Sequence, residues 1–405
     1  MTIADRLDRL RGRTPAGTGT GQSATLDDRL RRARGRQGAQ VARLSPTPDA
    51  LAASLGGQVV DGVVQVSRRW LPPAREPFGD DGLDGLPEVL GCGDADWVYL
   101  DTETTGLSGG VGTAVFMVGV ARRDRLGGLQ VRQFVLAGFA AEDAMLRQLV
   151  QWIGPHAVVV SYNGRCFDGP LLQARMRLHR VLPDLGGLRQ LDLMYTVRRA
   201  FRAHWPDCRL QTAERRLLGY VRRDDLPGSE APAAWHDWLR RGDACMLADV
   251  ARHNLDDVVT LARLHQRLPG IYAGRHADAV DEGAIGRAWW QAGFDGRALA
   301  VWEGGLPRLD ERAGLQLAAI YRRAGDWPRA ESLWLRLARA GSRSAACELS
   351  KYYEHRVRDP RRALRFADGC ADSDRTVRLA RLRRKLLGGP QLSLWSPTSV
   401  ANAMK

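Results

Sequence analysis

Residues 97–106 read Trp-Val-Tyr-Leu-Asp-Thr-Glu-Thr-Thr-Gly, an apolar run that ends in two carboxylates, Asp101 and Glu103. Alternate side chains of a β-strand point to the same face of the sheet, so these two acids would share a face. They would repel each other unless a cation lay between them, and Mg²⁺ prefers such all-oxygen surroundings. A solvated turn would explain the same residues, because Asp and Thr are common in turns.

The composition is that of an ordinary globular protein, with 405 residues of which 44% are hydrophobic and 26% are charged. No apolar run reaches the roughly 18 residues of a transmembrane helix, so neither a membrane span nor a membrane partner is expected. Six cysteines are scattered without a Cys-x-x-Cys pair. This pattern favours a reducing, cytoplasmic location over a zinc site or a disulfide framework.

The chain is strongly basic, with a formal net charge of +14 at pH 7. Such a charge favours polyanionic partners, and nucleic acid first among them. Lysine occurs only at positions 351, 385 and 405, so nearly all of the positive charge is arginine. Because an arginine-rich composition can also reflect the genome, the charge gives the nucleic-acid interpretation only mild support.

The central block has the element order of a ribonuclease H-like fold. Short apolar runs predict strands at 97–101, 114–122, 129–136, 157–161 and 188–193. The first three are closely spaced, as in an antiparallel meander. Helices are expected at 141–153, from Asp168 onward and at about 244–268. This order predicts an α/β fold with a mixed five-stranded sheet flanked by helices, preceded by a separate hairpin at 58–66.

A repeat in the C-terminal third indicates paired helices. Asp326 and Asp359 are 33 residues apart, as are Ala330 and Ala363. Small residues recurring near a period of about 34 residues are typical of tetratricopeptide-like helix pairs. The chain is thus expected to contain a disordered basic arm (1–45), an accessory segment and linker (46–94), a ribonuclease H-like domain (95–270), a tetratricopeptide-like helical domain (280–388) and a disordered tail (389–405).

Four acids and a histidine could form one catalytic site. Asp101 and Glu103 end the first strand, Asp168 starts the helix after the fourth strand, and Asp257 lies in the last helix of the block, one turn after His253. Four carboxylates can hold two metal ions about 4 Å apart, which suits phosphodiester hydrolysis. A histidine can accept the proton of the attacking water, because its pKa lies near neutral pH. A helix cap for Asp168 and solvated positions for Asp257 and His253 are the alternatives.

Three stretches carry a resemblance to known nucleases: Asp101-Thr-Glu-Thr-Thr-Gly, Tyr162-Asn163-x4-Asp168 and His253-x3-Asp257. They resemble the three exonuclease motifs of the DEDD superfamily. More closely, the chain resembles the bacterial YprB-like ribonuclease H-like family, over roughly residues 50–350. The matching stretches are DTETTGLSGGVGTAVFMVGVARR, VVVSYNGRCFDGPLL, LDLMYTVRRAF, LQTAERRLLGYVRRDDLPG and VARHNLDDVVTLARL. The helical tail also fits that family.

The resemblance implies a 3′→5′ exonuclease site with two Mg²⁺ or Mn²⁺ ions. It makes metal ligands of Asp101, Glu103, Asp168 and Asp257, and a general base of His253. One feature departs from the family pattern, because the histidine subclass spaces its histidine five residues before the aspartate rather than four. Asp256 is the rival ligand in the shifted register, about 100° around the helix.

Further expectations concern the substrate and the partners. Thr104, Thr105 and Asn163 could bind a nucleotide sugar or phosphate, although turn formation explains them equally well. The predicted partner is the 3′ end of single-stranded DNA or RNA, and the helical repeats could bind a protein. Two alternatives stay open: a binding module of the same fold that does not cut, and a protein-interaction scaffold acting through the repeats.

Overall fold

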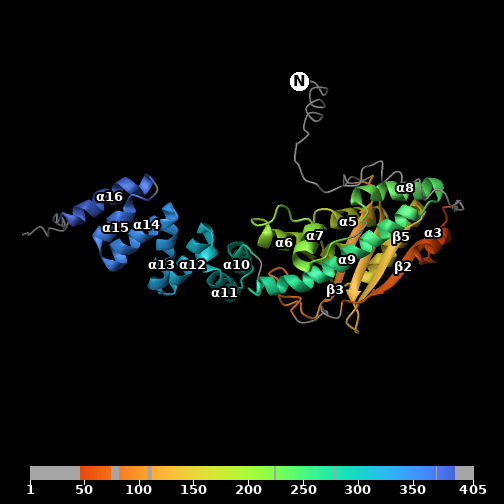
Figure 1. Cartoon of the computed structure of the whole chain (residues 1–405), viewed down its shortest axis with the longest axis horizontal. Coiled ribbons are helices and arrows are strands. Elements are labelled where there is room, and N and C mark those ends of the chain that lie inside the picture. The colour runs from red at the N-terminus through yellow and green to blue at the C-terminus, as the bar shows by residue number, and fades with distance from the viewer. Residues whose placement is uncertain are drawn as a thin grey trace, which may run out of the picture. The chain divides into compact units, whose positions relative to one another are not determined.

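Seven strands of the chain pair in one mixed sheet, in the order β1-β2-β5-β4-β3-β6-β7 (Figure 1). The structure, a computed structural model, describes residues 46–73, 82–106, 112–222, 225–276, 279–370 and 372–387. The predicted basic arm (1–45) and tail (389–405) lie outside the described residues. The strands are β1 (Gln58–Val60), β2 (Val63–Trp70), β3 (Asp96–Thr104), β4 (Val115–Arg123), β5 (Leu129–Leu136), β6 (Ala157–Ser161) and β7 (Arg189–Asp192).

The pairing of the strands confirms the predicted ribonuclease H-like fold class. Strands β3, β4 and β5 form the antiparallel meander, and β6 and β7 continue the sheet parallel to β3. The predicted hairpin is not separate from this sheet. Its second strand pairs antiparallel with β5 along its whole length, from Val63 opposite Leu136 to Trp70 opposite Leu129. The sheet therefore has seven strands where five were predicted.

Helices cover both faces of the sheet. The block predicted at 95–270 is called the nuclease-like block below. The α-helices from Pro48 to the end of this block are α3 (Pro48–Leu55), α4 (Glu142–Ile153), α5 (Asp168–Leu178), α6 (Leu193–Phe201), α7 (Leu210–Ala213), α8 (Ala231–Arg241) and α9 (Cys245–Tyr272). The long helix α9 runs across β3, β4 and β5 (Figure 1). Among the described helices, none combines the length and the apolarity needed to cross a membrane.

The alternation along β3 decides which face carries the acids. Tyr99 belongs to the hydrophobic cluster that contains residues of α6 and of the C-terminal half of α9. Its neighbours Val98 and Leu100 belong to the cluster that contains residues of α4 and α5. With a period of two, Asp101 continues the face of Tyr99 and is directed towards α9.

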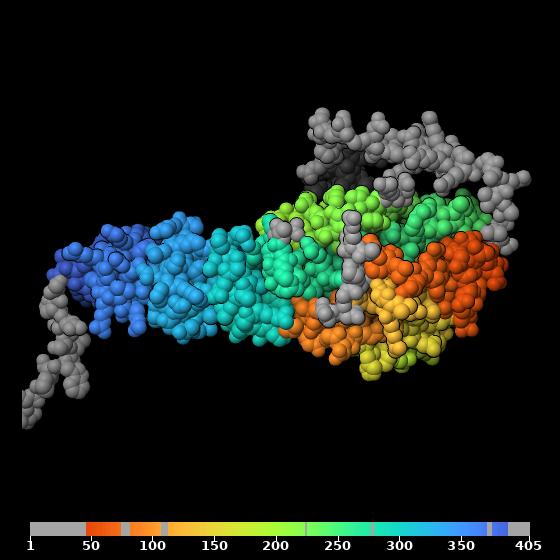
Figure 2. Space-filling model, turned by 60° about the horizontal axis from the view of Figure 1, so that its bottom comes forward, coloured from red at the N-terminus to blue at the C-terminus, as the bar shows by residue number. Residues whose placement is uncertain are grey.

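In the C-terminal region, helices that follow one another along the chain contact each other, and this region is coloured from cyan to dark blue in Figure 2. Its helices are α10 (Glu282–Gln291), α11 (Asp295–Gly304), α12 (Glu311–Arg323), α13 (Trp327–Arg339), α14 (Arg343–Tyr352), α15 (Pro360–Ala367) and α16 (Asp372–Leu386). Asp326 and Asp359 cap the N-termini of α13 and α15, and Ala330 and Ala363 are fully buried in those helices. The spacing of 33 residues therefore reflects one structural unit that occurs twice.

The hydrophobic core continues from the sheet into these helices. Trp289 of α10 is fully buried, and its indole N–H donates to the carbonyl of Tyr272, the last residue of α9, at 3.2 Å. The backbone N–H of Asp281 donates to the carbonyl of Ala200 in α6, at 2.8 Å. The start of the helical region is thus packed against the nuclease-like block.

Candidate active site

Strand β3 carries Asp101 and Glu103 to the side of the sheet that α9 covers. Asn254 of α9, which is fully buried, donates from Nδ2 to Oδ2 of Asp101 at 2.9 Å. Its side-chain oxygen accepts from Nε2 of Gln133 on β5 at 2.9 Å. The side-chain amide of Asn254 is thus held both at its N–H group and at its oxygen. An amide that is fixed in this way also fixes the orientation of the Asp101 carboxylate to which it donates.

A glycine on β4 lets α9 come this close. A Cβ atom at Gly119 would lie 2.1 Å from Oδ1 of Asn254, so no larger residue fits without moving that side chain. Gly119 lies opposite Asp101 in the β3–β4 register. The approach of α9 at this point also brings Asp257, one turn after Asn254, towards the acids of β3.

Asp168 reaches the site from the loop after β6. It is the first residue of α5, is 6% exposed, and accepts a hydrogen bond from the hydroxyl of Thr102, which lies between Asp101 and Glu103. The preceding loop is held by Asp192, whose carboxylate accepts from the backbone N–H groups of Asn163 and Arg165 at 2.8 and 3.1 Å. Asp192 therefore shapes the loop that positions Asp168.

The pKa values of Asp101, Glu103 and Asp168 are all raised, in part by the charges of neighbouring acids. Burial raises the pKa of Asp101 well above its usual range, and the negative charges of Asp257, Asp168 and Glu103 raise it further. Burial also raises the pKa of Glu103 to about 8 and that of Asp168 to about 6. Acids from three separate parts of the chain thus lie near enough to oppose one another's ionisation.

A loop residue, Arg222, lies against the fourth acid. Its guanidinium is 5% exposed and donates to Oδ1 of Asp257 and to the carboxylate of Glu214. Burial would lower the pKa of Arg222, but Asp257 and Glu214 raise it, so the guanidinium stays charged. Asp257 is therefore already neutralised by a cation of the protein itself.

Asp225, from the same loop, pairs with His253. Nδ1 of His253 donates to Oδ1 of Asp225 at 2.6 Å, and Nε2 lies 3.5 Å from Oδ2 of Asp257. Burial would lower the pKa of His253, but the charges of Asp257 and Asp225 raise it. The carboxylate at Nδ1 orients the ring so that Nε2 is directed at the acid cluster.

The chemistry of the donors fits a divalent cation. Glu103 is 8% exposed, and burial and the charges of Asp257 and Asp168 raise its pKa while the charge of His253 lowers it. Carboxylate oxygens are the ligands that Mg²⁺ and Mn²⁺ prefer. In the arrangement of the described residues, however, no group of three or more His, Cys, Asp and Glu side chains has the geometry of a metal site.

Comparison with known proteins identifies the family. Residues 98–269 match the model of the RNase_H superfamily. The chain is 30% identical over 333 residues to the uncharacterized protein YprB of Bacillus subtilis (strain 168), which covers 76% of this chain and 79% of that protein. The chain belongs to the YprB family. Since its domain is of the RNase H superfamily, nuclease-type hydrolysis of nucleic acid is the class of activity that the comparison supports.

In this member of the YprB family, the predicted acids are found together. Asp257, rather than its neighbour Asp256, is the acid whose charge raises the pKa of Asp101. His253 lies beside Asp257 despite its shorter spacing. The roles of these residues as ligands and base stay predictions.

The three predicted substrate-binding residues have structural contacts of their own. The hydroxyl of Thr104 donates to the carbonyl of Gly106 at 2.9 Å, and Oγ1 of Thr105 accepts from the N–H of Ala114 at 3.0 Å. Asn163 has a positive φ of 68°, which an asparagine tolerates in a tight turn. Each of the three residues thus has a local structural role, and a contact with substrate stays a prediction.

Four residues of the site were not predicted as part of it: Thr102, Asn254, Arg222 and Asp225. Arg222 and Asp225 lie in a loop whose sequence shows no periodic pattern of apolar residues. The loop belongs to one of the stretches that resemble the family. Asn254 lies next to His253 on α9, yet nothing in the local pattern indicates its contact with a strand 153 residues earlier. The family match was the one signal that could have drawn attention to the loop.

Proposed function

We propose that this protein is a metal-dependent nuclease that removes nucleotides from the 3′ end of single-stranded DNA or RNA in the cytoplasm. The observation that carries the proposal is the gathering of buried acids from β3, α5 and α9 around the C-terminal end of β3. The RNase H superfamily match supports nuclease-type hydrolysis. The order Asp101, Glu103, Asp168 and Asp257 along the chain resembles that of DEDD exonucleases, which supports the 3′→5′ direction. Six free cysteines fit a reducing compartment.

The four acids would hold Mg²⁺ or Mn²⁺, with two ions expected from the resemblance. Bound ions of this kind lower the pKa of water and offset the charge that develops on the phosphate. Asn254 donates a hydrogen bond to one oxygen of Asp101, and Thr102 donates one to an oxygen of Asp168. These two hydrogen bonds orient the carboxylates. A buried, oriented set of acids needs little rearrangement when a cation and a phosphate arrive.

His253 would accept the proton of the attacking water. Because Asp225 binds Nδ1 at 2.6 Å, the second nitrogen, Nε2, is the one directed at Asp257 and the acid cluster. A histidine oriented by a carboxylate is a common general base. This contact gives the histidine a defined orientation even though its spacing differs from that of the histidine subclass. Thr104, Thr105 and Asn163 remain candidates for contacts with the sugar or phosphate.

The test is digestion of 5′-labelled single-stranded DNA and RNA with Mg²⁺ or Mn²⁺, by the full chain and by Asp101→Asn and Glu103→Gln variants. We expect a ladder shortened from the 3′ end and a loss of at least about 10³-fold in each variant. The matched control is Asp237→Asn, because the side chain of Asp237 on α8 is 39% exposed and its ion pair to Arg241 is 3.8 Å long. Equal rates for the parent and the Asp101 variant would disprove the site.

The same assay separates the enzyme from a binding module that does not cut. A binding module would retain labelled single strands in a filter or gel assay while leaving their length unchanged with either metal. An enzyme whose Asp101→Asn variant still binds, yet no longer shortens the strand, would support catalysis by the acid cluster. Retention without shortening by the parent protein would favour the binding module.

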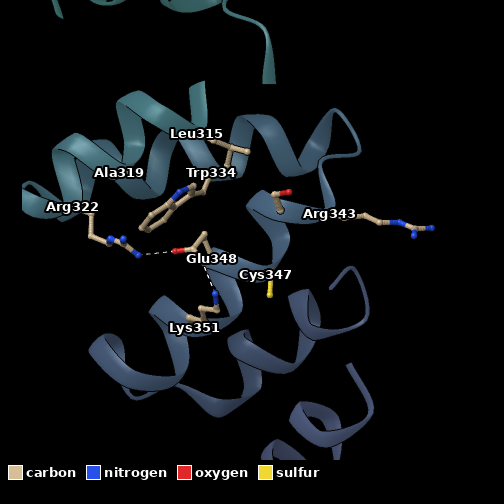
Figure 3. Close-up of a pocket in the computed structure, with 9 residues that line it drawn as sticks. Leu315, Ala319, Arg322, Trp334, Arg343, Cys347, Glu348 and Lys351 are labelled. Atoms are coloured by element: carbon tan, nitrogen blue, oxygen red, sulfur yellow. Dashed lines mark hydrogen bonds and ion pairs between the residues drawn. The ribbon is translucent and has the colours of Figure 1, made fainter. Parts of the chain in front are cut away.

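A groove in the helical region favours a second candidate function, binding of a protein. It has a volume of about 440 Å³ and lies between α12, α13 and α14 (Figure 3). Its lining includes Trp334 and the basic residues Arg322, Arg343 and Lys351, with one acid, Glu348, bound to Arg322 and Lys351 at 2.9 and 2.8 Å. The excess of positive charge suits an acidic peptide.

This second function can be tested by titrating the full chain with a peptide of alternating Glu and Leu, and with its Gln and Leu counterpart. We expect the acidic peptide to bind more tightly and the preference to fall in an Arg343→Glu variant. Equal affinity for both peptides would contradict the proposed recognition of charge.

A further inference from the structure

Tyr195 of α6 is an exposed aromatic side chain beside the loop that positions Asp168. It is 39% exposed, and its hydroxyl lies 3.0 Å from Sγ of Cys166, which is also exposed and precedes Asp168 by two residues. Asp192 caps the start of α6 and also accepts from two backbone N–H groups of this loop, so the helix and the loop are held together. The ring of Tyr195 thus meets solvent next to the loop that carries one of the predicted acids.

Two arginines lie on the same side of α6 as Tyr195. Arg198 and Arg202 follow it by three and seven residues, and side chains at this spacing share one face of a helix. Both arginines are exposed, and neither forms an ion pair with another residue that the structure describes. Burial raises the pKa of the Cys208 thiol and the charges of Arg198 and Arg202 oppose that rise, so both guanidinium groups act on the same region.

Arg199, between these two residues, makes the contacts of a structural arginine instead. Its Nη2 donates to Oε1 of Glu88 at 2.6 Å, and its Nη1 donates to the hydroxyl of Tyr272 at 3.1 Å. The sequence from 193 to 206 contains no Asp or Glu, so α6 has no acid of its own to neutralise its other two arginines. Positive charge that the protein leaves without a partner attracts a polyanion.

Arg165 adds a positive charge in the loop before Asp168. It is exposed and forms no ion pair within the described ranges of the chain. The hydrogen bond with Cys166 raises the pKa of Tyr195, and the charge of Arg165 opposes this rise, which places the guanidinium near the tyrosine. We call the four residues that combine an exposed ring with unneutralised positive charge the α6 surface: Arg165, Tyr195, Arg198 and Arg202.

We propose that the α6 surface binds the single strand whose 3′ end reaches the acid cluster. The proposal rests on the proposed nuclease function and adds the path of the substrate to it. Proteins bind single strands by stacking bases on aromatic rings and by placing positive charge along the phosphates. A base inside a duplex is covered on both faces by its neighbours, so a stacking ring favours a single strand over a duplex.

The experiment measures binding separately from digestion. Fluorescence anisotropy follows a 5′-labelled strand of mixed sequence, and the matching duplex, as the full chain is added in EDTA at several salt concentrations. The variants are Tyr195→Ala, Tyr195→Phe and Arg198→Ala/Arg202→Ala, and thermal denaturation checks that each is folded. The matched control is Arg361→Ala/Arg365→Ala on α15, where two exposed arginines have the same spacing and no ion pair among the described residues.

We expect Tyr195→Ala to weaken binding of the single strand about 5- to 150-fold with an unchanged dependence on salt, because stacking carries no charge. Tyr195→Phe and the α15 control should bind like the parent. In the arginine variant, the slope of log K against log salt concentration should become shallower by about 0.7 for each phosphate contact that is lost. The duplex should bind more weakly than the single strand.

A second readout needs no variant. A bound strand should slow the alkylation of Cys166 by N-ethylmaleimide, measured by peptide mass spectrometry, because Cys166 lies against Tyr195. Cys245, which is also exposed and begins α9, should react at an unchanged rate. If the Tyr195→Ala protein does not fold, this protection decides alone, and unchanged alkylation of Cys166 would overturn the proposal.

The binding data can fail independently of the nuclease proposal. Parent-like affinity in Tyr195→Ala or an unchanged salt slope in the arginine variant would overturn the role of the α6 surface, as would an equal loss in the α15 control. Equal affinity for strand and duplex, or no binding by the parent, would overturn it too, even if the parent digests the strand. The expected binding losses without any digestion in Mg²⁺ or Mn²⁺ would contradict only the nuclease.

Discussion

At the scale of single residues, the contact between Asp225 and His253 has a direct consequence for catalysis. If His253 is the base, an Asp225→Asn variant should lower kcat about 10- to 100-fold while KM changes little, because an amide orients the ring less well than a carboxylate. Steady-state rates on a labelled oligonucleotide measure both constants. The contact between Nδ1 and Asp225 is 2.6 Å long, so the loss should be clear.

The control asks whether the effect of the Asp225 substitution on the rate requires His253. Residues that act as a unit have non-additive effects, so Asp225→Asn/His253→Gln should be no slower than His253→Gln alone. A further loss in the double variant would show that Asp225 acts on something other than the histidine. Its ion pair with Arg222, 3.6 Å long, is the first alternative.

The residue scale also shows where sequence reasoning ends. Asp101, Glu103, Asp168, His253 and Asp257 were predicted because strand ends, helix starts and motif spacing are properties of short stretches. Arg222 is different, because its role is determined by its ion pairs with Glu214 and Asp257. These buried partners lie 8 and 35 positions away in the sequence. A pair of arginines in a polar loop looks like a solvated surface until those partners are known.

At the scale of elements, the closeness of α9 to β4 determines whether the site is assembled. A Gly119→Ala variant would place a methyl group 2.1 Å from Asn254, and so displace the side chain that holds Asp101. We expect a loss of about 1–3 kcal/mol in the free energy of unfolding, as for other overpacked sites, together with lower nuclease activity. Urea denaturation gives the first quantity and the labelled-strand assay the second.

A matched control exists one strand away. Gly138, after β5, has extended backbone geometry, and a Cβ atom there would meet nothing within 4 Å. Gly138→Ala should therefore leave both stability and activity unchanged. A Gly119→Ala protein as stable and active as the parent would show that α9 can move away from the sheet at no cost.

A second element-scale prediction concerns the docking of α16. Glu354 has a fully buried side chain that accepts from Arg381 at 2.7 and 2.8 Å and from Lys385 at 2.9 Å, both on α16. Burial alone would raise the pKa of Glu354, but hydrogen bonds and charge from Arg381 and Lys385 lower it to about 2, against an ordinary value of 4.5. A depressed pKa means that this stabilisation is full above about pH 4.5 and disappears as the pH falls towards 2.

Glu354→Gln should therefore cost about 3 kcal/mol in the free energy of unfolding at pH 7 and progressively less between pH 5 and pH 2. Urea denaturation of parent and variant across this range measures the difference. Glu348→Gln is the control, because Glu348 makes its ion pairs at a 25% exposed position and should matter less. A cost that stayed constant with pH would show that packing, rather than charge, holds α16.

The elements themselves were predicted well, because their signals are local. The apolar run at 129–136 is strand β5 to the residue, and the predicted strand at 97–101 lies within β3. Strand pairing is not local. The hairpin at 58–66 was predicted, but its partner β5 begins about 60 positions later, so the extension of the sheet to seven strands could not be seen in the pattern.

At the scale of the whole molecule, the core passes from the sheet to the helical region without a break. Trp289 of α10 contacts Tyr272 of α9, with ring centroids 6.4 Å apart, and both side chains are fully buried. The boundary predicted between residues 270 and 280 stays a prediction, and the packing of Trp289 on Tyr272 lies across it. The described residues from Pro46 onward accordingly form one compact unit by their contacts. The stability of the nuclease-like block should then depend on α10.

The Trp289→Ala variant tests this dependence. Removing a buried tryptophan costs about 3–5 kcal/mol, and a shared core predicts that amide hydrogen exchange will speed up in α6 and at the end of α9 as well as in α10 and α11. Trp327→Ala is the control, because Trp327 stacks on Tyr352 between α13 and α14, with ring centroids 5.6 Å apart, and should loosen only those helices. If Trp289→Ala left α6 and α9 as protected as in the parent, the two regions would unfold independently, and the nuclease-like block would keep its acid cluster without the helical region.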